Sequence, residues 1–134
     1  MNLAEVMQEL ADQLDTIAGL NAFGYPADTI SPPAAMVDYP DGIEFDATYG
    51  RGSDTMVVPV YVAVGKASDR AARDTLGAYA DGAGAKSVKQ VLEAGAYEAF
   101  DTCRVSGAEF AVITVGAVDY LAAKFTVDIT GPGE

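Results

Sequence analysis

The sequence predicts an α+β domain, a mostly antiparallel sheet with helices packed on it. Three observations indicate this class: an amphipathic helical repeat at the N-terminus, alternating strand patterns at 43–65 and 102–129, and a helical crossover at 69–94 between them. Strands grouped around a helical crossover, with hairpins on either side, are typical of α+β proteins. A chain of 134 residues corresponds to one domain. We therefore expect a single domain over 1–134, with a frayed tail at 131–134.

The N-terminal segment 3–18 has the pattern of an amphipathic helix. Its apolar residues recur at intervals of three and four, which places them on one face. Asn2 is expected to cap this helix, with Glu5 at the capping-box position, and Gly19 to end it. Short strands are expected at 20–25 and 34–38, on either side of a proline-rich extended stretch.

The central segment 43–65 predicts a hairpin. In its first arm apolar residues alternate with Glu44 and Asp46, which therefore share a polar face. The tip contains Arg51, Gly52 and Ser53, and its glycines permit the positive φ angles of a tight turn.

The second arm of this hairpin is apolar on both faces, so each face needs a cover. Met56, Val58, Val60, Val62 and Val64 form one row, which is expected to face the core. The other row contains Val57, Pro59 and Tyr61. Because Pro59 has no amide donor, we expect this arm at a sheet edge or a bulge. The cover of the second row is either the helix at 69–79 or another copy of the protein.

The remaining elements are two helices and three strands. A helix at 69–79 is expected to begin after Ser68, and a third to be capped by Ser87, with Gln90 completing a capping box. A short strand is expected at 102–106. A second hairpin, 109–115 with 118–129, is expected to turn at Gly116-Ala117.

The composition excludes several classes of function. The chain has no histidine, so the commonest general base and the usual zinc ligand are absent. Cys103 is the single cysteine and is expected in the core. The net charge of −12 repels nucleic acid. No apolar run approaches the ~20 residues of a membrane span, so no membrane association is expected.

Candidate catalytic groups have simpler explanations. Glu44 and Asp46 resemble a carboxylate pair for acid–base chemistry, but an exposed polar strand face explains them better. Ser68 is better explained as a helix cap than as a nucleophile. We therefore expect no enzyme activity, no catalytic residues, no metal site and no cofactor.

Four stretches of the chain resemble the tail terminator proteins of long, non-contractile-tailed bacteriophages, in the form common among actinobacterial phages. They cover most of the chain in the family's order, and none is a catalytic signature. The stretches are PADTISPPAAMVDYP at 26–40, FDATYGRGSDTMVVPVYVAVGKASDRAA at 45–72, DGAGAKSVKQVLEA at 81–94 and VGAVDYLAAKFTVDI at 115–129.

The resemblance implies an α+β protomer that forms a hexameric ring in the virion, at the interface of head and tail. Such a ring ends growth of the tail tube and joins it to the head-completion or stopper protein, after assembly in the host cytoplasm. Genomic DNA passes through its hole without specific binding. Val57, Pro59 and Tyr61 are then candidate contacts between subunits. Glu44, Asp46 and Asp54 are candidate acidic residues of the hole, where they would repel DNA.

Two alternatives stay open. Another neck protein, such as a head–tail connector or stopper, has similar size and acidity. A small-ligand binding module or minor hydrolase centred on Glu44 and Asp46 belongs to a different class, and the absence of histidine counts against it.

Overall fold

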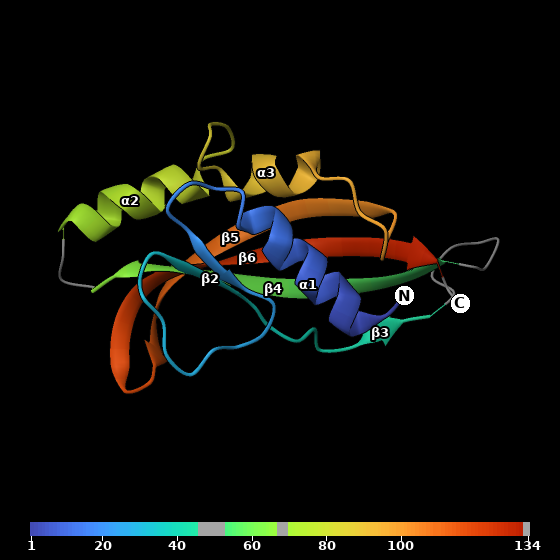
Figure 1. The fold of residues 1–134 in the computed structure, drawn as a ribbon, viewed down its shortest axis with the longest axis horizontal. Helices are drawn as coiled ribbons and strands as arrows, with labels where there is room; N and C mark the ends of the chain where they lie inside the picture. Colours follow the sequence, from blue (N-terminus) through green and yellow to red (C-terminus); the bar gives the residue numbers. More distant parts are fainter. Residues whose placement is uncertain (46–52, 67–69, 133–134) are drawn as a thin grey trace.

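The computed structural model describes residues 1–45, 53–66 and 70–132. Over these residues the chain forms three helices and one six-stranded sheet, which confirms the α+β prediction (Figure 1). The helices are α1 (Leu3–Leu14), α2 (Arg70–Ala80) and α3 (Val88–Ala94). The strands are β1 (Asn21–Phe23), β2 (Ala34–Val37), β3 (Ile43–Glu44), β4 (Ser53–Gly65), β5 (Thr102–Val115) and β6 (Val118–Pro132).

The sheet is built on the long antiparallel ladder between β4 and β6. The strand order is β1-β2-β4-β6-β5, and β3 also pairs with β4, beyond the end of β2. Only β1 and β2 run parallel among the pairings of the described residues. The central hairpin is therefore present as β3 and β4, but its tip lies outside the described residues except for Ser53, the first residue of β4.

The two C-terminal strands are longer than the sequence indicated. β5 runs continuously through 106–108, because a bulge between Val105 and Gly107 absorbs the break in alternation. β6 continues to Pro132, whose carbonyl accepts a hydrogen bond of 2.8 Å from the Met1 ammonium. The prediction of a frayed tail at 131–134 was therefore wrong for 131–132, and 133–134 lie outside the described residues.

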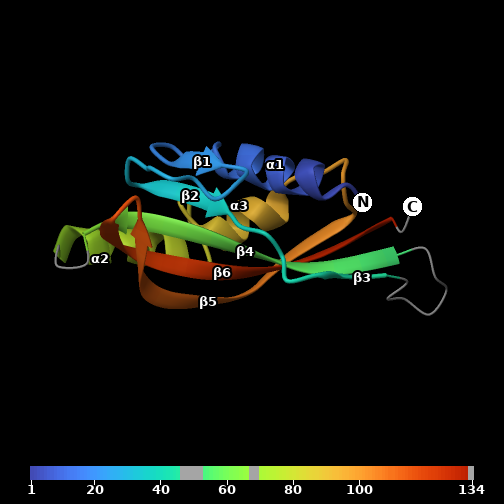
Figure 2. The same cartoon turned by 90° about the horizontal axis from the view of Figure 1, so that it is seen from below.

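All three helices pack on one face of the sheet (Figures 1 and 2). Their buried residues form a single cluster with the β4 row Met56, Val58, Val60, Val62 and Val64. From β6, the cluster takes Ala123, Phe125, Val127 and Ile129. This confirms the predicted core row of β4.

The predicted caps of α1 and α3 are present, and Ser68, the predicted cap of α2, lies outside the described residues. The Asn2 side chain accepts a hydrogen bond of 3.1 Å from the Glu5 amide, and Ser87 accepts one of 3.1 Å from the Gln90 amide. α1 ends at Leu14, four residues before the predicted end, because the amides of Thr16 and Ile17 bond back only three residues. Ile17 is still buried, so its apolar spacing continued past the end of the helix.

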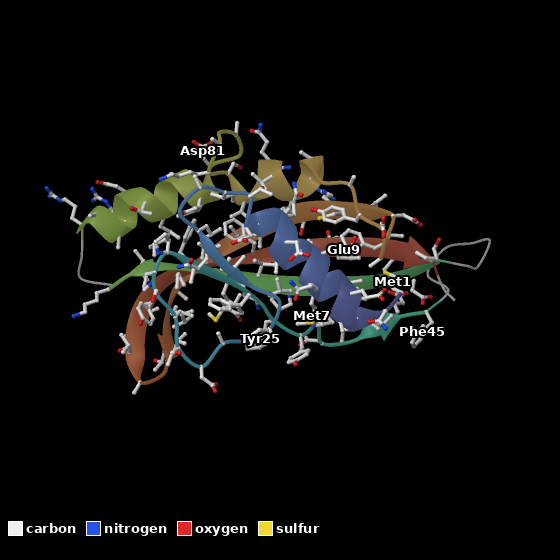
Figure 3. All side chains as sticks on the ribbon, in the orientation of Figure 1. Met1, Met7, Glu9, Tyr25, Phe45 and Asp81 are labelled. Atoms are coloured by element: carbon white, nitrogen blue, oxygen red, sulfur yellow. The ribbon has the colours of Figure 1, made fainter. Side chains whose placement is uncertain are left out.

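The segment between α3 and β5 is held by α1. The Glu9 carboxylate accepts hydrogen bonds of 2.7 Å from the amides of Glu98 and Ala99 (Figure 3). Nearby, the rings of Tyr97 and Phe100 stack with centroids 4.3 Å apart. Cys103 packs against the core, as predicted, and burial raises the pKa of its thiol to about 12. The thiol therefore stays protonated at neutral pH.

The turn between β5 and β6 is the two-residue turn that the sequence predicted. Gly116 has φ 58° and Ala117 has φ 67°, the signs required at both central positions of a type I′ turn. A side chain at Gly116 would lie 2.6 Å from the carbonyl oxygen of Asp28. The turn therefore requires glycine at 116, whereas alanine at 117 pays a steric penalty.

We expect opposite effects from two substitutions in this turn. Ala117→Gly should raise the free energy of unfolding by about 0.5–1 kcal/mol, because glycine adopts the left-handed conformation without strain. Gly116→Ala should lower it by more than 1 kcal/mol, roughly the left-handed penalty plus the clash. Urea unfolding of both variants measures this. Equal destabilisation by both would contradict the assigned turn.

Candidate interaction surface

The face of the sheet turned away from the helices, here called the outer face, carries the candidate contacts. Val57, Pro59 and Tyr61 of β4 lie on it, directly opposite Asp128, Thr126 and Lys124 of β6. Val57 is 51% exposed, whereas Pro59 and Tyr61 are half-buried. An apolar row thus runs along the middle of the sheet, beside a polar row on β6.

α2 does not cover this apolar row. Its buried residues Ala72, Leu76 and Tyr79 belong to the cluster on the other face, with Val58 and Val60. The sequence left two covers open for Val57, Pro59 and Tyr61, and the helix at 69–79 is excluded. The other cover, another copy of the protein, stays a prediction.

Pro59 lies in an interior strand and away from the bulge of β4, so the prediction of an edge strand or a bulge was wrong. Its carbonyl accepts a hydrogen bond of 2.9 Å from the Asp38 amide, which places its nitrogen on the β2 side as well. On that side, pairing with β2 stops at Val60 and pairing with β3 starts only at Met56. The missing amide donor of proline therefore faces the interruption between two strands, where no ladder bond is lost.

Two hollows flank the middle of the outer face. One, of about 470 Å³, is lined by Val57, Pro59, Glu44 and Lys124 among others. The other, of about 550 Å³, is more apolar and lies between Tyr61, Met36 and the turn at Gly116. The apolar row of β4 thus runs from one hollow to the other.

The acidic candidates do not form one face. Glu44 pairs with Thr55 and is exposed on the outer face. Asp54 is one position further along β4, on the helix side, and only 5% exposed. Grouping Asp54 with Glu44 was therefore wrong, because successive strand residues alternate in direction. Asp46, Arg51 and Gly52 lie outside the described residues.

Sequence reasoning missed a second apolar surface, on β5. Phe110 and Val112 are 61% and 54% exposed, directly opposite Ala123 and Leu121 of β6. These partners place them on the helix side of the sheet, beyond the area that the helices cover. The signal was present in the alternation of 108–112, but β5 was divided at 106–109 and its position at the sheet edge cannot be read from the sequence.

Comparison with known proteins gives no family. No family model matches the chain, and no curated protein matches it. Within the described residues, no helix is long and apolar enough to span a membrane. The same residues contain no group of three or more acidic, cysteine or histidine side chains placed to hold a metal ion.

Val57 and Val58 provide a matched test of the two faces. Val57→Glu should change the free energy of unfolding by less than about 1 kcal/mol, because the carboxylate reaches solvent on the outer face. Val58→Glu should cost at least about 4 kcal/mol, because it buries an unpaired charge. Urea unfolding followed by circular dichroism measures both. A Val57→Glu variant that unfolds would show that the outer face is covered within the monomer.

Proposed function

We propose that the protein is a structural virion subunit that caps a phage tail tube as a ring and joins the tail to the head-completion protein. The observation that carries the proposal is the apolar row Val57, Pro59 and Tyr61 on the central strand, which the helices do not cover. Such a row has no role in a monomer whose core lies on the other face. The sequence resemblance to tail terminators supports the same function.

The charge distribution agrees with a passage for DNA. The first 50 residues contain no lysine or arginine, so this part of the chain supplies acidic groups without basic ones. Asp41 and Glu44 both line the hollow beside β3. Acidic groups repel the phosphate backbone, whereas each phosphate neutralised by a basic group strengthens binding. We therefore place Glu44 at the hole of the ring and leave Asp54 out of it.

Two other functions remain as alternatives. A connector or stopper protein of the neck has the same need for an exposed contact surface. A small-ligand binding module is favoured by the more apolar hollow beside Tyr61, whose volume of about 550 Å³ is within the usual range for ligand sites.

The decisive experiment is electron microscopy of phage particles assembled without this protein. Tails of abnormal length that do not join heads are expected, because nothing stops growth of the tube. Tails of normal length on particles that fail to join would favour the connector or stopper. Normal infectious particles would contradict every neck function.

The contact surface is tested by complementing such particles with Tyr61→Glu. A charge on the apolar row should prevent ring formation and leave the tail defect uncorrected, although the purified monomer stays folded. Ala78→Glu is the control, because Ala78 is exposed on the helix side of the molecule. Equal rescue by both variants would remove the outer face from the ring contact.

The lumen assignment predicts an effect of charge reversal. Glu44→Lys should slow DNA ejection at low salt, because a basic hole retains phosphates, and high salt should restore the rate. Lys66→Glu is the control, since it changes an exposed charge at the opposite end of β4. Ejection from Glu44→Lys particles at the normal rate in low salt would place Glu44 outside the hole.

A further inference from the structure

β5 forms an edge of the sheet, and only its first part is covered. α3 packs over the beginning of the strand, and the Glu93 carboxylate accepts a hydrogen bond of 3.0 Å from the Val105 amide. Lys89 donates a hydrogen bond of 2.6 Å to the same carboxylate. This bond and the one from the Val105 amide hold the pKa of the Glu93 carboxyl below its usual range. From 106 to 112 every residue is exposed, and no described strand pairs with the outer side.

The uncovered part has the properties of a strand-pairing site. Its edge presents backbone N–H and C=O groups, and a second strand laid alongside forms hydrogen bonds with all of them. Phe110 and Val112 add two large exposed apolar side chains on the same face. A long edge strand with exposed apolar side chains is a self-association hazard unless a partner covers it.

The charge of the molecule indicates what that partner is. Between Val105 and Val118 the sole charged residue is Glu109, and Lys124 lies directly opposite it on β6. The whole chain carries −12, so a basic partner is drawn to other surfaces and DNA is repelled. Two copies of this chain repel each other elsewhere, and the edge of β5 is a stretch where they can approach closely.

The length of the strands selects β5 itself as the partner element. Across the described residues, the opposite side of the sheet offers β1 with three residues and β3 with two. Neither matches the uncovered part of β5. We propose that β5 pairs antiparallel with β5 of a second copy, about a two-fold axis at Ala111. In this register Phe110 lies opposite Val112 of the second copy, and the two Glu109 carboxylates are four residues out of register.

This contact is separate from the proposed ring. A two-fold contact is isologous and closes on itself, whereas a ring needs a head-to-tail contact. The inference therefore does not rest on the tail function, and either can fail alone. Each copy contributes about ten residues to this contact, fewer than the 20–30 residues that each partner contributes to a standard interface. The pair is therefore a weak dimer that dissociates on dilution.

Disulfide trapping tests the geometry. In a Cys103→Ser background, Ala111→Cys should form a disulfide-linked dimer on mild oxidation, because the two-fold axis brings the two positions together. Gly107→Cys is the matched control, on the same strand and with open space for a side chain. In the proposed register its two copies are ~26 Å apart, too far for a disulfide. Trapping at both positions alike, or at 107 alone, would overturn this register.

Sedimentation of the reduced protein tests the contact without a cross-link. The wild-type chain should shift from monomer to dimer with rising concentration, and Phe110→Glu should weaken the dimer at least tenfold with an unchanged circular dichroism spectrum. Ala78→Glu should dimerise like the wild type. A wild-type chain that stays monomeric at millimolar concentration, or a dimer that tolerates Phe110→Glu, would overturn the proposal.

Discussion

Burial of one row of β4 is the constraint on which the other parts of the structure depend. Met56, Val58, Val60, Val62 and Val64 are each at most 9% exposed, and a fully buried side chain of this size contributes about 1.5–3 kcal/mol. The buried side chains of all three helices belong to the same cluster as this row and its neighbours on β6. Because side chains alternate along a strand, fixing the row inward also fixes Val57, Pro59 and Tyr61 outward. The uncovered row is thus a consequence of the core.

Local chemistry explains the parts of the fold that the sequence predicted correctly. Asn2 and Ser87 cap helices through hydrogen bonds to amides three residues on, and Gly116-Ala117 makes a two-residue turn. Each of these signals acts within a few residues. The order of strands depends instead on contacts between distant segments. For this reason the sequence left open which row α2 covers, and placed Pro59 on an edge strand or at a bulge.

In the candidate site, the same dependence on distant contacts decides on which face a single residue lies. Glu44 and Asp54 are both acidic and flank the predicted tip. Whether they lie on the same face of the sheet depends on the register of the hairpin. Ile43 pairs with Met56 and Glu44 with Thr55, which leaves Asp54 on the helix side. A shift of one residue reverses the face of every side chain in a strand. The alternation within each arm predicted which of its residues share a face. Which face of one arm lies on the same side as which face of the other is set by the pairing of the two strands.

Two surfaces of the sheet carry exposed apolar side chains, and their geometry differs. The interior strands carry an apolar row beside two hollows, which suits a head-to-tail contact with a different surface of a neighbouring copy. The edge at β5 presents backbone groups and a nearly uncharged stretch, which suits a like strand. Glu93 covers the Val105 amide and so ends the free edge at its start, while the turn at Gly116 ends it at the other side. A contact confined between these limits is shorter than a standard interface, so the dimer proposed for β5 is a weak one, and it uses a different surface from the ring proposed for the outer face.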